Sequence, residues 1–386
     1  MTPIHKNKFL TFGAPLIGED EIKEVVDCLE LGWLGTGPKV KRFEEQFREY
    51  KNCQYSIGLN SCTAALHLSL IALDIGPGDE VITTPLTFCA TVNSIIHTGA
   101  TPVLADVDPI SMNIDPASIE EKITEKTKCI LPVHFAGRSC DMDAITTIAR
   151  ENDLFLVEDC AHSIETKFHG RSAGTFGDIG CFSFYVTKNI VTGEGGMIIT
   201  DDEMKVNRIK RLALHGMSKD AWNRFSDKGY QHYLVEEIGY KYNMMDLQAA
   251  IGIHQLNKVD AHWKRREEIW NHFNDELKNL PVTLPAPIEA ETKHAYHLYT
   301  ILIDEDQTGV SREGFIIKLH KKNIGTGVHY LSIPEHPIYQ QRYNWSTKDY
   351  PNAMKIGQET VSLPLSPKLT DEDVCAVVEA VKGVFR

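Results

Sequence analysis

The chain has 386 residues, 42% of them hydrophobic and 24% charged, an ordinary globular composition that excludes a disordered or fibrous chain. Its 40 Lys and Arg against 53 Asp and Glu give a net charge of −13, which excludes nucleic-acid binding through a broad cationic face. No apolar stretch is long enough to cross a membrane, and the polar first ten residues do not resemble a signal peptide. We therefore expect a cytoplasmic protein without a membrane partner.

The nine cysteines are scattered and never form a C-x-x-C pair. This spacing favours neither a disulfide framework nor a zinc site, so no metal is predicted. Free cysteines in apolar runs are typical of buried residues in a reducing compartment.

Short apolar runs alternate with helix-like segments between residue 55 and about residue 200. Strands are predicted at 80–84, 102–105, 129–133, 154–158 and 180–185, with helices at 60–73 and 141–151. Strands that alternate with helices indicate βαβ units and a mainly parallel sheet covered on both faces. In such sheets, ligands bind at the carboxyl ends of the strands.

The pattern changes after residue 201, where helices are predicted at 204–214, 247–257 and 261–280. A proline-rich segment, 281–287, marks a plausible boundary. Beyond it we predict a strand at 297–303, a helix at 311–322, a strand at 325–330 and a helix at 371–384. The expected organisation is a large α/β domain, residues 1–262, and a smaller α+β domain, residues 263–386.

Two charged residues follow predicted strands of the large domain. Asp159 ends the run V-E-D-C-A-H, where a buried carboxylate is unfavourable unless a cation meets it. Lys188 follows an apolar strand in F-S-F-Y-V-T-K-N. Taken singly, a capping or salt-bridged Asp and a solvated loop Lys are the more common roles.

Two backbone features accompany these residues. The run G-L-N-S-C-T-A-A-L joins a strand to a helix N-terminus, which suits a phosphate but is also found in any capped helix. The run G-E-G-G at 193–196 permits a tight turn just beyond the lysine.

Together the four features favour one cofactor, pyridoxal phosphate. A Schiff-base lysine needs an aldehyde, which is the predicted role of Lys188. The ring nitrogen needs a carboxylate such as Asp159 to keep its proton. The phosphate needs a helix N-terminus, where Cys62 and Thr63 offer backbone N–H groups, and Phe88 is a candidate to stack on the ring.

The chain resembles the DegT/DnrJ/EryC1/StrS family of nucleotide-sugar aminotransferases along nearly its whole length. The matching motifs are G-D-E-V-I-T-T-P-L-T-F, G-A-T-P-V-L-A-D-V-D, P-V-H-F-A-G, V-E-D-C-A-H, F-S-F-Y-V-T-K-N with G-E-G-G, and I-G-T-G-V-H-Y. The resemblance implies an aspartate-aminotransferase-like (fold type I) large domain with a mostly parallel central sheet. L-H-G-M-S-K-D-A-W-N-R and G-T-G-V-H-Y look closest to the bacterial UDP-4-amino-4-deoxy-L-arabinose aminotransferases.

The resemblance also implies roles for individual residues. Lys188 matches the Schiff-base lysine and proton carrier, and Asp159 the partner of the ring nitrogen. His162 stands near the expected position of the cofactor's phenolic oxygen, and Ser183 matches a phosphate-binding serine. Asn243 matches an asparagine that reaches the phosphate in the neighbouring subunit, so a homodimer with shared active sites is expected.

The family usually has Ser-Gly-Thr at the phosphate turn, whereas this chain has Ser61-Cys62-Thr63. The change matters if the middle residue needs a positive φ, which Cys tolerates poorly. If only its N–H group is used, the change is harmless.

The expected activity is the transfer of an amino group from L-glutamate to C4 of a UDP- or dTDP-linked keto-sugar, by a ping-pong mechanism, for polysaccharide or lipopolysaccharide synthesis. Candidate substrate contacts are Lys241, Arg224, His329 and Tyr330. A related sugar 3-dehydratase is disfavoured, because that branch replaces the lysine with His. An aminotransferase for a cyclitol or another carbonyl compound, and a catalytically silent homologue, remain as alternatives.

Overall fold

A computed structural model describes residues 9–218 and 233–386 and contains a seven-stranded sheet in the order β1-β9-β8-β5-β4-β2-β3. The strands are β1 (Tyr55–Leu59), β2 (Glu80–Thr83), β3 (Thr101–Leu104), β4 (Thr127–Leu131), β5 (Phe155–Asp159), β8 (Ile179–Ser183) and β9 (Gly196–Thr200). Five adjacent strands pair in parallel, and β9 is antiparallel to both of its neighbours. The prediction of a mainly parallel α/β sheet is therefore confirmed.

The strand direction places most functional positions at one edge. Because β9 is antiparallel to both β1 and β8, the strands β1 and β8 run in the same direction as the rest of the sheet. Every strand of this sheet except β9 therefore ends at the same edge, and β9 begins there. The residues after β1, β2, β5 and β8 are brought together as the parallel topology requires.

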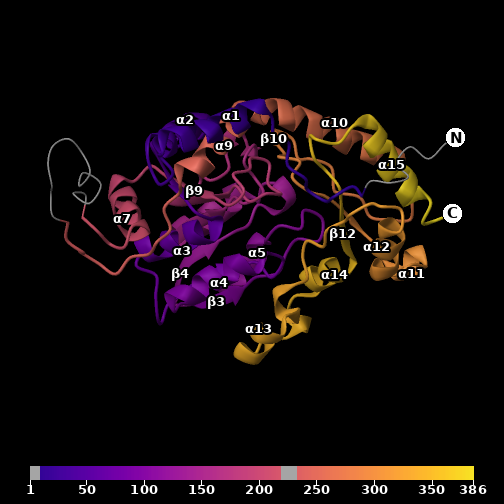
Figure 1. Ribbon diagram of the computed structural model, residues 1–386. Helices are drawn as coiled ribbons and strands as arrows, with labels where there is room; N and C mark the ends of the chain where they lie inside the picture. The colour runs from indigo at the N-terminus through magenta and orange to yellow at the C-terminus, as the bar shows by residue number, and fades with distance from the viewer. Residues whose placement is uncertain (1–8, 219–232) are drawn as a thin grey trace.

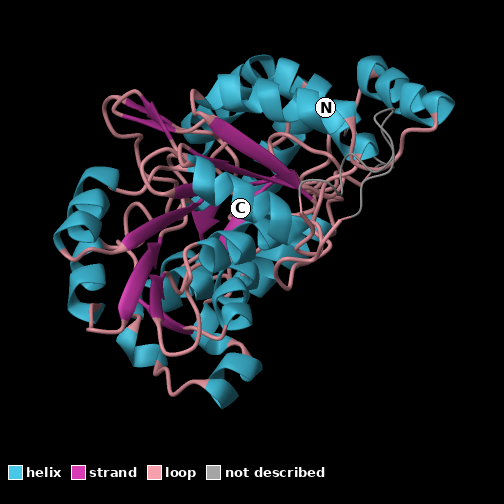
Figure 2. Cartoon of the chain, turned by 90° about the vertical axis from the view of Figure 1, so that its left-hand side faces the viewer, coloured by secondary structure: helices cyan, strands magenta, loops and turns pink. Residues whose placement is uncertain are grey.

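Helices cover both faces of the sheet, as Figures 1 and 2 show. One face packs on α3 (Cys62–Ala72), which lies among α4 (Cys89–Thr98), α7 (Glu203–Ala213) and the strands. Alternate strand residues face opposite sides: Val81, Cys129 and Val157 belong to the core around α3, and their neighbours Ile82, Ile130 and Leu156 to the core around α6 (Met142–Glu151). Strands buried on both sides explain the unbroken apolar runs.

Two helices that the sequence analysis did not predict, α1 (Glu19–Leu31) and α2 (Pro38–Lys51), lie against α9 (Asp246–Asn257). Figure 1 shows the three together, above β9 in this view. Phe43 and Phe47 of α2 pack on Phe182 and Phe184, which flank the end of β8.

A second core gathers around the pair β11 (Tyr299–Leu302) and β12 (Thr360–Leu363), which run antiparallel. The helices α12 (Arg312–His320) and α15 (Asp371–Lys382) pack in it with the later part of α10 (Val259–Leu277). Val259, at the start of α10, belongs instead to the core beside Phe43. The boundary after residue 262 stays a prediction.

The remaining elements are short. They are α5 (Pro116–Lys122), α11 (Glu305–Thr308), α13 (Pro337–Arg342), α14 (Pro351–Glu359), β6 (Lys167–Phe168), β7 (Arg171–Ser172), β10 (Thr292–Lys293) and the 3₁₀ turns at Phe135–Gly137, Ile333–Glu335 and Thr347–Asp349. In the part of the chain that the structure describes, no helix is both long enough and apolar enough to cross a bilayer.

The strand predicted at 325–330 is wrong. The segment makes single bridges, from Gly327 to Ser362 and, just before it, from Ile324 to Leu10. Gly327 exchanges two backbone hydrogen bonds with Ser362, whereas Gly325 donates to Leu10. The segment therefore has different partners at neighbouring positions and does not run along one strand.

Candidate active site

Asp159 ends β5 and is 4% exposed. Its Oδ2 accepts a hydrogen bond from Thr91 Oγ1 at 2.9 Å, and its Oδ1 accepts one from the N–H of Ala161 at 3.1 Å. Burial raises the pKa of Asp159, and these bonds and the Lys188 charge only partly oppose it. A carboxylate with so few donors has lone pairs left for a cationic ligand.

Lys188 lies in the loop after β8, where its N–H donates to the Tyr185 carbonyl at 2.9 Å. Burial lowers the pKa of Lys188 to about 8, against the opposing effects of Asp159 and Cys62. About a tenth of the amine is therefore neutral at pH 7 and about half at pH 8, far more than for a lysine of ordinary pKa, and the neutral amine is the form that reacts with an aldehyde. Ser183, the last residue of β8, pairs with Gly196 and is buried at the same edge.

The turn before α3 is arranged as a helix cap. Ser61 Oγ accepts the N–H of Ala64 at 3.1 Å, which leaves the first N–H groups of the helix, those of Cys62 and Thr63, for a ligand. Cys62 is helical and is not among the residues with positive φ. The departure from Ser-Gly-Thr therefore causes no backbone strain in this turn.

Gly196 allows β9 to pass directly beneath this turn. A Cβ built there would lie 2.5 Å from the Ser61 carbonyl and 2.6 Å from the Cys62 nitrogen, closer than real Cβ atoms approach. The glycine-rich run after the lysine thus has a packing role: it brings the loop of Lys188 and the start of α3 to one place.

An aromatic group lies over the same edge. Phe88, just before α4, is 58% exposed, and its ring centroid is 6.0 Å from that of Tyr330. The Tyr330 hydroxyl is 3.0 Å from His162 Nε2. His329 Nδ1 is 2.8 Å from Ser362 Oγ, and burial, then the Lys188 charge, lowers the pKa of His329 to about 3.

The other predicted contacts are less central. Asn243 bridges to Leu59, and its amide NH₂ donates to Thr36 Oγ1, while its Oδ1 is buried without a partner in the described parts of the chain. Lys241 is exposed, and its carbonyl accepts from Asn60. Arg224 lies outside the described residues.

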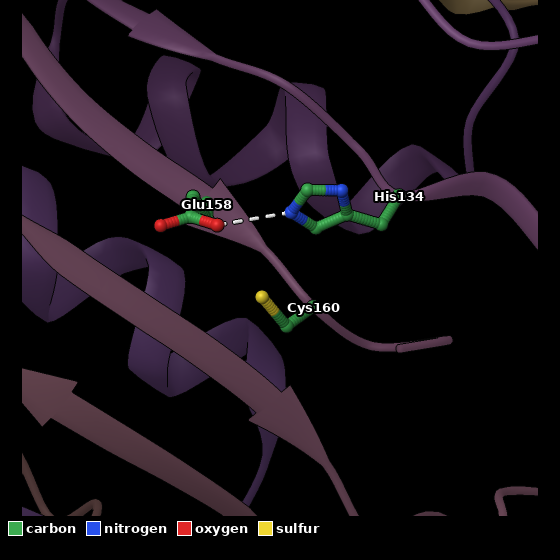
Figure 3. Close-up of side chains that lie close together, drawn as sticks. All are labelled: His134, Glu158 and Cys160. Atoms are coloured by element: carbon green, nitrogen blue, oxygen red, sulfur yellow. Dashed lines mark hydrogen bonds and ion pairs between the residues drawn. The ribbon is translucent and has the colours of Figure 1, made fainter. Parts of the chain in front are cut away.

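The opposite side of β5 contains a second buried group, formed by His134, Glu158 and Cys160, which Figure 3 shows. Both Glu158 oxygens are occupied by four donors, the N–H groups of Gly174, Phe176 and Gly177 and the ring of His134. Burial alone would raise the pKa of Glu158, but these bonds outweigh it and lower the pKa.

The side chains of this group are not free to bind a metal. His134 Nδ1 accepts the N–H of Cys140 at 3.1 Å, so the imidazole proton is on Nε2 and donates to Glu158. Burial raises the pKa of the Cys160 thiol well above its usual value and disfavours the thiolate that metals bind. His134 is thus a buried histidine with both ring nitrogens hydrogen-bonded within the protein.

Sequence reasoning missed Thr91 and Asn189. Thr87 and Thr91 are four residues apart in T-F-C-A-T, and their hydroxyls are 2.8 Å apart; this spacing was the available signal for Thr91. Asn189 directly follows Lys188 and donates to Glu165 and to the Ala295 carbonyl. It fixes the loop behind the lysine.

The residues at this edge fit pyridoxal phosphate. They combine a lysine of lowered pKa for the aldehyde, a buried carboxylate with unused lone pairs for the ring nitrogen, and a helix start with free N–H groups for the phosphate. The structure thus brings Lys188, Asp159 and the start of α3 to one edge, while their roles toward the cofactor stay predictions.

Comparison with known proteins gives the same answer. The family model described as "DegT/DnrJ/EryC1/StrS aminotransferase family" matches residues 15–382. The spore coat polysaccharide biosynthesis protein SpsC of Bacillus subtilis is 49% identical over 382 residues, 99% of this chain and 98% of that protein.

Solved structures agree in fold and cofactor. The Streptococcus pneumoniae protein Spr1654, described as a sugar aminotransferase and solved in its PMP form, is 34% identical with a TM-score of 0.91, covering 97% of this chain and 98% of that one. Helicobacter pylori PseC, an aminotransferase involved in pseudoaminic acid biosynthesis, is 29% identical with a TM-score of 0.90, covering 98% and 99%. The chain therefore belongs to the DegT/DnrJ/EryC1/StrS aminotransferase family, whose sugar aminotransferases use pyridoxal phosphate.

Proposed function

We propose that this chain transfers an amino group from L-glutamate to C4 of a keto-sugar carried on UDP or dTDP, in two half-reactions that share one site. The observation that carries the proposal is the gathering of Lys188, Asp159 and the start of α3 at one sheet edge. The roles of SpsC in spore coat polysaccharide biosynthesis and of PseC in pseudoaminic acid biosynthesis support a product that enters a surface polysaccharide or glycan.

The chain's own residues would perform the proton transfer. When bound, pyridoxal phosphate supplies an aldehyde that combines reversibly with amines and a ring that withdraws electrons. Lys188 Nζ would hold that aldehyde, then take a proton from the substrate carbon and return it, which a pKa near 8 permits at neutral pH. Asp159 would hold the proton on the ring nitrogen.

The phosphate and the ring face would be held by neutral groups. The N–H groups of Cys62 and Thr63 would bind the phosphate together with Ser183, and Phe88 would cover the ring. This distribution is compatible with a chain of net charge −13, because helix ends replace bulk positive charge.

We also propose a homodimer. Helix α1 exposes a row of apolar side chains at helical spacing, Ile22, Val26 and Leu29, and the turn after it exposes Trp33; each is between 43% and 58% exposed. A row of this size on one face is typical of a surface covered by another chain. Asn243 would reach the second site with the second N–H of its amide, because the bond to Thr36 uses only one of the two.

The proposed compartment is the cytoplasm. All nine cysteines are unpaired, and six are buried, five of them in the cores around the sheet, as expected where thiols stay reduced.

A panel of nucleotide-linked keto-sugars tests the activity. Each is mixed with the holoenzyme and L-glutamate, and 2-oxoglutarate release is followed together with the amino sugar. We expect release with at least one UDP- or dTDP-linked 4-keto sugar and none without a sugar beyond a single turnover. If no keto-sugar is accepted but a keto-cyclitol is, the cyclitol alternative replaces this proposal; a chain that never binds the cofactor would support the silent homologue.

A further inference from the structure

Helix α4 carries three hydroxyl side chains, and one of them differs from the other two. Ser94 Oγ and Thr98 Oγ1 donate to carbonyls three residues earlier in the same helix, those of Thr91 and Ile95, at 2.7 and 2.8 Å. Such local bonds are the usual choice of Ser and Thr within a helix. Thr91 Oγ1 instead donates to Asp159 Oδ2, 68 residues away in the chain, at 2.9 Å. Thr91 is therefore used to hold another segment rather than its own helix.

A second hydroxyl stands behind the first. Thr87 Oγ1 lies 2.8 Å from Thr91 Oγ1. The Thr91 hydroxyl has a single hydrogen, and an ionised carboxylate can only accept, so this hydrogen is given to Asp159. Thr87 must then donate to Thr91. The result is a one-way chain of two hydroxyls that ends on the carboxylate.

This chain of hydroxyls is closed off from water. Thr87 and Thr91 are 2% and 1% exposed, and Asp159 is buried with them. Inside a protein, hydroxyl groups in a row polarise one another, and a hydrogen bond to a charge is stronger than in water. Burial raises the pKa of Asp159, and the Thr91 bond is among the contacts that oppose this rise. The two threonines therefore favour the ionised form of the carboxylate.

The same bonds fix the direction of the Asp159 side chain. Its Oδ2 is held by Thr91 and its Oδ1 by the N–H of Ala161 at 3.1 Å, so the carboxylate cannot rotate without losing a bond. The Thr91 N–H donates to the Phe88 carbonyl at 3.1 Å. One turn of chain thus carries both the aromatic side chain that is a candidate to cover the ring and the hydroxyl that orients Asp159.

We propose that Thr91 and Thr87 are positioning residues for Asp159: their chain of hydrogen bonds keeps the carboxylate ionised and oriented, and so keeps the proton on the ring nitrogen of the cofactor. The inference rests on the role that the proposed function gives to Asp159 and deepens it. It makes the protonation of the ring depend on two hydroxyl groups besides the carboxylate itself.

The protonation of the ring nitrogen can be observed directly. Pyridoxal phosphate labelled with ¹⁵N in the ring is bound to the apoprotein, and ¹⁵N NMR distinguishes a protonated ring nitrogen from a neutral one without any substrate. We expect a protonated nitrogen in the wild type. Thr91→Val removes the hydroxyl with little change of shape and should move the resonance toward the neutral position. Thr91→Ser keeps a hydroxyl and should keep the wild-type resonance.

Turnover gives a second readout. Thr91→Val should lower kcat about tenfold in each half-reaction, because a hydrogen bond to a charged group is lost, and should change KM less than about twofold. Thr87→Val should lower kcat about threefold by itself and cost nothing more when Thr91→Val has already cut the chain. Thr98→Val makes the same change on the same helix. It is the matched control and should leave the nitrogen resonance and kcat unchanged.

Three results would overturn the inference: an unchanged nitrogen resonance in Thr91→Val, a shifted resonance in Thr91→Ser, or additive losses of kcat in the double variant. If Thr91→Val does not bind the cofactor, Thr87→Val should still shift the resonance in the same direction by a smaller amount, and no shift there would overturn the inference as well. Failure of the proposed function is distinct. A keto-sugar panel without release would remove the activity, and a neutral ring nitrogen in the wild type would remove the role of Asp159 itself.

Discussion

The two faces of β5 hold neighbouring buried carboxylates with opposite properties. Glu158 receives four N–H donors and its pKa is lowered, whereas Asp159 receives two donors and its pKa is raised. Successive residues of a strand point to opposite sides of the sheet, so these two adjacent carboxylates lie in different environments. The difference teaches that the carboxylate whose hydrogen bonds are complete holds the structure together, and the incomplete one is available for a ligand.

The largest effect is expected on the Asp159 side, from Lys188→Ala. Turnover should fall by about 10⁴-fold or more, because both the amine that holds the cofactor and the proton carrier are lost. Steady-state kinetics and the cofactor's visible absorbance measure it. Lys205→Ala is the matched control: it removes a lysine that pairs with Asp178, just before β8 at the opposite edge of the sheet, and should keep full turnover. Multiple turnover by Lys188→Ala would refute the assignment.

Asp159→Asn should separate activity from stability. We expect turnover to drop by about 10² to 10³-fold, because the neutral amide cannot hold a proton on the ring nitrogen. The free energy of unfolding of the apoprotein should stay the same or rise, since the raised pKa shows that burying the charge is unfavourable. Urea unfolding of the apoprotein checks the second point; a clear loss of stability would contradict it.

Glu158→Gln should instead lower stability and leave activity nearly unchanged. Removing the charge leaves His134 and three backbone N–H groups with a poorer acceptor, so the free energy of unfolding should fall by about 3 kcal/mol. Activity per folded molecule should stay within about threefold. If this variant instead loses activity without losing stability, the two faces of β5 are not functionally distinct.

The smallest effect concerns pH. The pKa of Lys188 is lowered from its ordinary value to about 8, so the neutral amine increases as pH rises to that point and levels off above it. The rate at which the apoprotein takes up pyridoxal phosphate should therefore rise about fivefold between pH 7 and pH 8. Stopped-flow absorbance measures it, and a flat profile over this range would contradict the shift.

The sheet and its reactive edge could be predicted because their signals are local. Strands buried on both faces give unbroken apolar runs, and parallel topology brings the residues after β5 and β8 to one edge. Partners could not be predicted where they are distant in the chain: Thr91 lies 68 residues from Asp159, and Tyr330 lies 168 residues from His162.

Two elements of the fold differ from the prediction. Helix α1 was not predicted, although Ile22, Val26 and Leu29 recur at helical spacing; the sequence could not show that this apolar side is exposed and that Glu21 is buried. The strand at 325–330 was wrong because its glycines bond to partners on different segments. Roles for Cys62, Phe88, Ser183 and Asn243 stay predictions.

Helix α10 has a consequence for how the molecule unfolds. Its 19 residues span about 28 Å, and it begins with Val259 in the core beside Phe43 and continues with Trp270 and Phe273 in the core of β11 and β12. Because one continuous helix belongs to both cores, neither core can unfold without disrupting the helix on which the other packs. Heating should therefore produce a single calorimetric unfolding transition, although a chain of this length often shows two transitions.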